Sequence, residues 1–209
     1  MAARAGLTID SLTASAAELA DEVGFERVTV SELARRVGVK PASLYSHLRG
    51  SDDLRGRISV LALSELGDRL SIALAGRSGR HALDAVVTVM RSYAHEHPGR
   101  WESTQVRITA SEAGPVGAKV GALMLGIMRG YDIPPQEQTH AVRLVSAAVD
   151  GFIRLQANGS FDRSEPNAEA SWTRMIQALD TALSHWPAGA PDGSSVDNRE
   201  TDNSERTSR

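Results

Sequence analysis

The chain has 209 residues, a formal net charge of −3 and no cysteine. The absence of cysteine excludes disulfides, zinc fingers, iron–sulfur clusters and thiol catalysis. The negative net charge excludes a general affinity for nucleic acid, so any contact with DNA has to come from a local cationic patch.

The sequence gives no sign of a membrane partner. The first residues, MAARAGLTID, lack the apolar core of a signal peptide. The longest apolar run, residues 120–128, is too short to cross a bilayer and contains glycine. We therefore expect the chain to work in the cytoplasm.

A first helix is predicted over residues 7–23, because apolar side chains recur there at helical spacing, for example at Ile9, Leu12, Ala16 and Leu19. We expect this helix to lie behind the two helices that follow it in the chain. It would then close a small three-helix core.

The next part of the chain is predicted to form two short helices with a sharp turn between them. Thr29 and Glu32 have the spacing of a capping box, which marks the start of a helix. Gly38 follows the end of that helix and supplies the left-handed conformation that turns the chain. Pro41 suits the first position of a second helix, which we expect over residues 40–47.

The charges of this segment point to DNA. No Asp or Glu occurs between Leu33 and Ser51. The basic residues there are Arg35, Arg36, Lys40, His47 and Arg49. A cation-rich, acid-free helix pair in an acidic chain indicates contact with phosphate. The alternative is an ordinary pair of antiparallel helices in a core, and the missing acids argue against it.

The segment resembles the DNA-binding domain of the tetracycline-repressor (TetR) family. The resemblance covers roughly residues 7–55 and rests on Gly24-Phe25, Thr29-Val30, Leu33-Ala34, Val37-Gly38-Val39, Leu44-Tyr45, His47 and Asp52-Asp53-Leu54. Two positions depart from the family pattern. Leu48 stands in place of the usual aromatic residue. Ser51 stands in place of a common lysine, where we expect it to cap the next helix.

The resemblance implies a helix-turn-helix whose second helix enters the major groove of double-stranded DNA. The candidate DNA-binding residues are Thr29, Arg36, Lys40, Pro41, Ala42, Ser43, Tyr45, Ser46, His47 and Arg49. Those at the start of the second helix, Lys40, Ala42 and Ser43, suit base edges. Thr29, Tyr45, His47 and Arg49 suit phosphates. An ion pair with Glu32, at helical spacing, is the alternative role of Arg36.

The pattern from Ser51 to Trp186 is helical almost throughout. A long helix from Ser51 is followed by one that stops at Pro98, a shorter one from about Trp101, another over 115–129 and two final helices. The fold class is therefore predicted to be all-α, with about nine helices. Three parts are expected, namely a helix-turn-helix domain (residues 1–50), a ligand-binding and dimerisation domain (51–186) and a disordered tail (187–209).

Adaptable and aromatic apolar residues are concentrated in the middle helices. They are Met90, Tyr93, Trp101, Met124, Met128 and Phe152. The resemblance implies that such residues line a pocket for a small apolar ligand, and plain core packing remains the alternative for each. Residues 93–101, 150–152 and 158–161 also resemble the C-terminal domain of a TetR subfamily with a Trp-His-Gly signature. Gly151 alone of that tripeptide is present.

The last two predicted helices carry strong apolar stripes. The candidate interface residues are Val142, Val145, Val149, Trp172, Met175, Ile176, Leu179 and Leu183. Pairing these helices with the same two helices of a second subunit gives a four-helix interface, as the resemblance also implies. Burial within one subunit is the alternative.

No catalytic constellation, metal site or cofactor motif is recognised. His95 and His97 point about 200° apart on a helix and cannot share an ion. The sequence predicts a bacterial, homodimeric transcriptional regulator, most of all a ligand-responsive repressor of a near-palindromic operator. The alternatives are an activator or ligand-independent regulator of the same fold, or a helical binding module or enzyme whose helix-turn-helix is vestigial.

Overall fold

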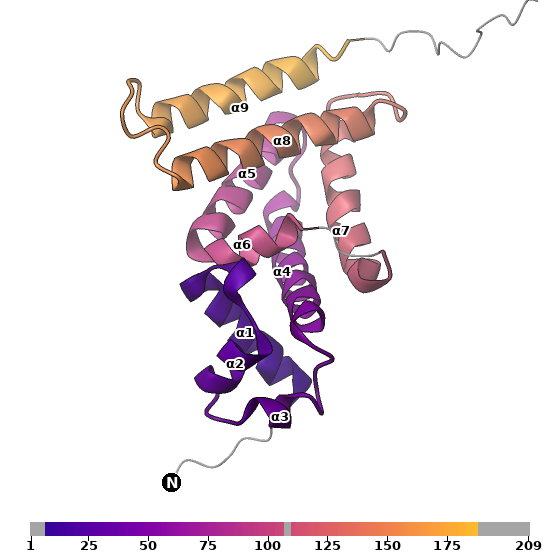
Figure 1. Ribbon diagram of the computed structural model, residues 1–209. Coiled ribbons are helices and arrows are strands. Elements are labelled where there is room, and N and C mark those ends of the chain that lie inside the picture. Colours follow the sequence, from indigo (N-terminus) through magenta and orange to yellow (C-terminus); the bar gives the residue numbers. More distant parts are fainter. Residues whose placement is uncertain (1–6, 107–109, 188–209) are drawn as a thin grey trace, which may run out of the picture.

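The structure, a computed structural model, describes residues 7–106 and 110–187 (Figure 1). Within these residues all regular structure is helical, in nine α-helices and one 3-10 turn. The elements are α1 (Ile9–Val23), η1 (Phe25–Arg27), α2 (Val30–Arg36), α3 (Pro41–Leu44), α4 (Ser51–Leu74), α5 (Gly79–Glu96), α6 (Pro98–Thr104), α7 (Ala110–Arg129), α8 (Gln138–Ala157) and α9 (Ala168–Ser184). The predicted all-α class is confirmed.

The N-terminal helices α1 to α3 form a small unit, here called the head. Its core contains the fully buried Leu12, Leu33 and Leu44. The first two turns of α4 belong to the same core through Leu54 and Ile58. Since α4 then continues to Leu74 without a break, one helix is shared between the head and the rest of the molecule.

The capping box predicted at the start of α2 is only half formed. The Thr29 hydroxyl accepts a hydrogen bond from the amide of Glu32 at 3.1 Å, as expected. The Glu32 carboxylate does not return to Thr29 and pairs with Arg35 instead. The amide of Val30 donates to the hydroxyl of Ser51 at 3.2 Å.

Ser51 therefore does not cap its own helix, contrary to our expectation. The cap position of α4 is occupied by Gly50, which makes no side-chain hydrogen bond. The Ser51 hydroxyl satisfies one of the free amides at the start of α2, which a helix end leaves without an internal partner. This bond ties the starts of α2 and α4 together.

The remaining helices form the body of the molecule. Figure 1 shows α4, α5 and α7 running away from the head, with α8 and α9 lying across their far ends. The body core includes Leu70, Leu83, Val86, Met128 and Val145, all buried. Helix α6 begins at its proline, three residues before the predicted start at Trp101. Helix α7 is interrupted at Gly114, so the stretch from Pro115 matches the prediction.

None of the helices in the described ranges combines the length and the apolar character needed to cross a bilayer. The tail predicted to be disordered, residues 187–209, lies outside the described residues except for Pro187.

Candidate nucleic-acid interface and effector cavities

Helix α3 presents a continuous solvent-exposed surface on a fixed base. Leu44 and Leu48 are fully buried beneath it. The candidate residues around them, namely Lys40, Pro41, Ala42, Ser43, Tyr45, Ser46 and His47, are all exposed. The α-helix itself ends at Leu44. Beyond it the chain forms a tighter turn, in which the amide of His47 donates to the Leu44 carbonyl three residues back at 2.9 Å. The predicted helix over 40–47 is thus shorter than expected.

The turn before α3 follows the predicted chemistry. Gly38 has φ +71°, a left-handed conformation that glycine adopts at low cost. The amide of Val39 reaches back to the Ala34 carbonyl at 3.0 Å, and the Gly38 amide reaches the Arg35 carbonyl at 3.3 Å. These bonds satisfy carbonyls at the end of α2 and fix the angle at which α3 leaves it.

The basic residues of this region differ in what they contact. The guanidinium of Arg36 bonds Glu18 (3.0 Å) and Glu22 (2.6 Å) of α1, and only 26% of its side chain is exposed. The alternative ion pair between Arg36 and Glu32 is therefore wrong, since Glu32 pairs with Arg35. The hydrogen bonds that Arg36 donates to Glu22 and, to a lesser extent, to Glu18 raise the pKa of Arg36 above its ordinary value.

Lys40 and His47 are exposed, and neither forms an ion pair with another residue of the described ranges. Thr29 is half-buried, with its hydroxyl engaged in capping α2. The cationic character of the α3 surface therefore depends on Lys40 and on Arg49 just beyond it.

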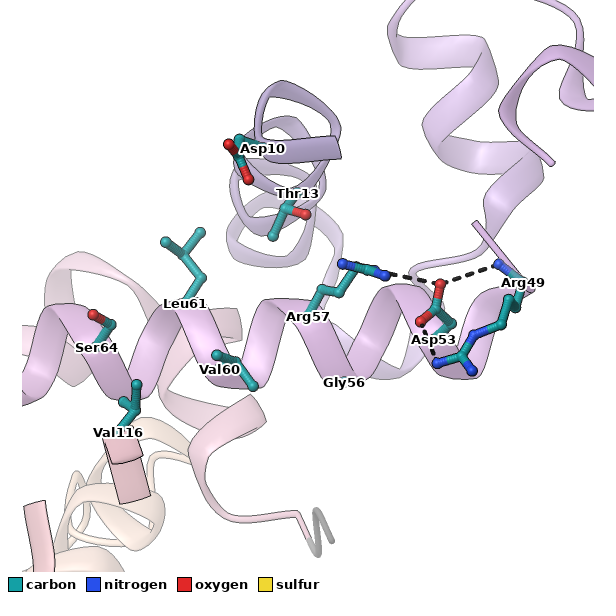
Figure 2. Close-up of a pocket in the computed structure, with 10 residues that line it drawn as sticks. All are labelled: Asp10, Thr13, Arg49, Asp53, Gly56, Arg57, Val60, Leu61, Ser64 and Val116. Atoms are coloured by element: carbon teal, nitrogen blue, oxygen red, sulfur yellow. Dashed lines mark hydrogen bonds and ion pairs between the residues drawn. The ribbon is translucent and has the colours of Figure 1, made fainter. Parts of the chain in front are cut away.

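Arg49 is anchored to the start of α4 by Asp53, whose side chain is only 10% exposed. The Asp53 carboxylate accepts from the Arg49 amide (3.1 Å), from Arg49 Nη2 (3.2 Å) and from Arg57 Nε (3.3 Å), as Figure 2 shows. Burial raises the pKa of Asp53, but the hydrogen bonds from the Arg49 amide, Arg57 and the Arg49 side chain lower it more. The Arg49 backbone is held while most of its side chain stays exposed.

A polar joint between α1 and α6 connects the head to the body, and sequence reasoning missed it. The amide of Arg100 donates to Asp21 Oδ1 at 2.9 Å, and His97 Nδ1 lies 3.2 Å from Asp21 Oδ2. The Phe25 amide donates to the Glu102 carboxylate at 3.1 Å. These pairs are 76 to 79 residues apart in the chain, so no local pattern could reveal them.

Tyr93, predicted to line a pocket, belongs to a polar network instead. Its fully buried side chain donates to Glu65 at 2.8 Å and to the Ala62 carbonyl at 3.3 Å. Burial and the Glu65 carboxylate raise the pKa of Tyr93 well above its usual range. Arg100 Nη1 also bonds Glu65 at 3.3 Å, so the network reaches the joint with α1.

Two cavities lie among the helices of the body. The first, about 140 Å³, is lined by Met90, Trp101 and Met124 of the predicted set. The second, about 450 Å³, lies between α6 and the C-terminal half of α8 and is lined by Glu102 among others. Both are lined by Trp101, Gln105 and Asp150. Met128 and Phe152 are buried but line neither cavity.

The candidate interface residues on α8 and α9 mostly face their own subunit. Val145, Val149, Trp172, Ile176, Leu179 and Leu183 are buried within the chain. Val142 and Met175 are half-buried against the same core. The alternative of burial within one subunit therefore accounts for the stripe. Large apolar side chains on the other side of α8, missed by sequence reasoning, are Leu144 and Leu155, at 42% and 47% exposure.

Comparisons with known proteins agree with this architecture. Residues 12–58 match the family described as bacterial regulatory proteins, tetR family, and residues 83–179 match the tetracyclin repressor-like C-terminal domain. The uncharacterized HTH-type transcriptional regulator YobS of Bacillus subtilis is 30% identical over 174 residues, which are 81% of this chain and 90% of YobS. The similar regulator Rv0681 of Mycobacterium tuberculosis is 27% identical, over 84% and 81% of the two chains.

Solved structures share the fold. A TetR variant from Acinetobacter baumannii AYE in complex with minocycline superposes with a TM-score of 0.68 at 21% identity, over 88% of this chain and all of that one. BioQ with its natural double-stranded DNA operator superposes with a TM-score of 0.63 at 19% identity, over 86% and 99%.

Proposed function

The chain belongs to the TetR family of helix-turn-helix transcriptional regulators, and we propose that it is a homodimeric repressor that leaves a near-palindromic operator when a small ligand enters its body. TetR proteins are regulators rather than enzymes, so the alternative of an enzyme with a vestigial helix-turn-helix is set aside. We propose that it acts on the chromosome, and therefore in the bacterial cytoplasm.

The observation that carries the proposal is the exposed, acid-free surface of α3 on its buried base. In the proposed complex α3 enters the major groove, and the exposed Lys40, Ala42 and Ser43 contact base edges. Tyr45, His47 and Arg49 contact phosphates, which set the register of the helix on the duplex. Thr29 and Arg36 are weaker candidates, because their polar groups are already engaged.

Dimerisation is proposed through the outer face of α8 and α9, which Figure 1 shows at the end of the body opposite the head. The exposed Leu144 and Leu155 of α8 supply the apolar contact. A two-fold axis through this face gives two copies of α3, and hence half-sites about one helical turn (~34–36 Å) apart or somewhat more.

The proposed ligand site is the pair of cavities that meet at Trp101. Apolar side chains of Met90, Trp101 and Met124 line the smaller cavity. Asp150 and Gln105 add polar groups that both cavities share. A mostly apolar lining with a few polar groups is typical of small-molecule sites.

The geometry supplies a route from this site to the head. Glu102 lines the larger cavity, and its carboxylate holds the Phe25 amide of the head. Gly99 of the same helix abuts α1 so closely that a Cβ atom there would lie 2.0 Å from the Ala20 carbonyl oxygen. A ligand that displaces α6 therefore has to move α1 as well. It shifts the equilibrium only as far as it binds the displaced state more tightly.

We also propose the division of the chain at residue 50, with a DNA-binding domain at 1–50, a ligand-binding and dimerisation domain at 51–186 and a tail beyond. Separate core clusters around Leu12 and around Leu83 support it. Helix α4 contributes to both clusters, so the two domains are expected to move through α4 and not independently.

The test is a footprint on DNA that flanks the gene of this protein, followed by a salt titration of binding. We expect a protected, near-palindromic site and a logarithmic affinity that falls by roughly 0.9 per log unit of salt for each phosphate contacted. Absent or salt-independent binding would overturn the proposal. Transcription of the neighbouring genes in a deletion strain should rise for a repressor, whereas a fall would identify an activator.

A further inference from the structure

A groove of about 500 Å³ lies where the head meets the body, apart from the cavities of the effector site. Figure 2 shows α1 crossing α4 there, with Asp10 and Thr13 of α1 on the same side of α4 as Leu61 and Ser64. Its size is that of a small-molecule site. Arg49, a proposed DNA contact, lies at one end of the groove.

The charged end of the groove contains arginine N–H groups that are available to a ligand. Asp53 already accepts three hydrogen bonds from Arg49 and Arg57. Arg57 uses only Nε in this contact, and among the described side chains, those of residues 7–106 and 114–187, its two terminal nitrogens have no hydrogen-bond partner. A guanidinium with two open N–H groups suits a carboxylate. The other acid, Asp10, lies in the first turn of α1, where the helix dipole stabilises it.

The other end of the groove is apolar. Val60 and Leu61 of α4 and Val116 of α7 line it. Along α4 this end follows Arg57 by about one turn, because Arg57 precedes Val60 and Leu61 by three and four residues. An occupant that matches both ends needs an anionic head beside Arg57 and Arg49 and an apolar tail along α4.

We propose that this groove binds an organic carboxylate with an apolar tail, and that the carboxylate engages Arg57 and Arg49. Because Arg49 is also a proposed phosphate contact, the ligand and DNA would bind the same arginine side chain. The site is separate from the effector cavities around Trp101 and does not depend on them.

The test measures binding of octanoate to the purified full chain by isothermal titration calorimetry, without DNA. Octan-1-ol and octylammonium are the matched probes without the negative charge. We expect octanoate to bind most tightly, and Arg57→Gln to weaken it about ten- to a hundredfold, as expected for a charge-assisted hydrogen bond. Arg55→Gln is the control, because Arg55 lies on the same helix and pairs with Asp52 outside the groove.

Two further variants separate the parts of the proposal. Val60→Trp should fill the apolar end and abolish octanoate binding, while Arg49→Gln should weaken it. Equal binding of the three probes, or octanoate binding that Arg57→Gln and Val60→Trp leave intact, would overturn the site. If Arg49→Gln binds octanoate with unchanged affinity, the proposed contact between the carboxylate and Arg49 is wrong. None of these outcomes depends on operator binding, so a failure here is distinct from a failure of the proposed function.

Discussion

Arg100 is fastened to Asp21 through both its backbone and its side chain. Its amide donates to Asp21 Oδ1 at 2.9 Å, and its Nε lies 3.1 Å from Oδ2, without hydrogen-bond geometry. Both side chains are largely buried. Asp21 belongs to the head and Arg100 to α6, so this pair joins the head directly to the body.

The first prediction concerns this pair. Asp21→Ala should lower the free energy of unfolding by about 2–4 kcal/mol, because it leaves the largely buried Arg100 guanidinium with Glu65 as its remaining partner. Urea denaturation followed by circular dichroism measures the effect. Asp68→Ala is the control, since Asp68 is an exposed partner of Lys119 and should contribute about 0–1 kcal/mol. Equal losses in the two variants would show that the pair has no special role.

The second prediction concerns the close approach of α6 and α1. Gly99→Ala would place a Cβ atom 2.0 Å from the Ala20 carbonyl oxygen, so the two helices must separate. We expect a loss of more than about 2 kcal/mol of stability, in the range of overpacking, together with weaker operator binding. Thermal unfolding and a gel-shift assay measure the two effects.

The matched control is Gly121→Ala on α7, where a Cβ atom meets nothing within 4 Å. Alanine is favoured over glycine inside a helix by roughly 0.5–1 kcal/mol, so this variant should be neutral or slightly stabilising. A Gly99→Ala protein as stable as Gly121→Ala would contradict the close approach of α6 to α1.

The sequence predicted the head better than the body for a physical reason. In the head the relevant features follow from short-range patterns, each set by one helix end or one helix face. Examples are the turn at Gly38 and the burial of Leu44 and Leu48 beside the exposed Lys40. An apolar stripe, by contrast, indicates that a helix face is covered, but it does not indicate whether the same subunit or a second subunit covers it. Val149 is therefore equally consistent with a dimer interface and with the subunit core, where it lies.

Polar contacts between distant segments were beyond the reach of sequence patterns altogether. Ser51 is an apt helix cap by composition, yet its hydroxyl serves α2, because the tertiary fold brings the Val30 amide within 3.2 Å. Tyr93 has the character of a pocket residue, yet Glu65 of α4 engages its hydroxyl. In both cases the deciding partner is more than 20 residues away.

The third prediction tests the docking of α3. Lys40→Ala should weaken operator binding by about 1–3 kcal/mol and also reduce the preference for the operator over a mismatched sequence, as loss of a base contact does. Tyr45→Phe should weaken binding to all sequences alike, because a phosphate contact carries no sequence information. Fluorescence anisotropy with operator and scrambled duplexes distinguishes the two.

Lys119→Ala is the control for charge, since Lys119 is the only other lysine of the chain and pairs with Asp68 on the body. It should leave both affinities unchanged. If Lys40→Ala and Tyr45→Phe both bind like the unmodified protein, α3 does not enter the groove as proposed.

The fourth prediction follows from the lowered pKa of Asp53. A carboxyl with a lower pKa in the folded state stabilises the fold above its unfolded pKa of about 3.9, and this stabilisation disappears as the pH falls through the folded value. The stability difference between the unmodified protein and Asp53→Asn should thus be constant above about pH 5 and shrink below about pH 4. Urea midpoints measured across this range test it. A constant difference for Asp53→Asn down to the lowest pH would refute the prediction.

The fifth prediction concerns the proposed dimer face. Leu144→Glu should convert the dimer to a folded monomer. The position is exposed in the single subunit, so a glutamate there can stay in water, whereas at the centre of an apolar interface its charge would be buried without a partner. Sedimentation velocity gives the mass, and circular dichroism confirms that the helices remain. Ile72→Glu is the control, since Ile72 is 79% exposed on α4 and lies outside the proposed face. Loss of the dimer should also weaken operator binding steeply, because each half-site then binds alone. A Leu144→Glu protein that remains dimeric would place the interface elsewhere.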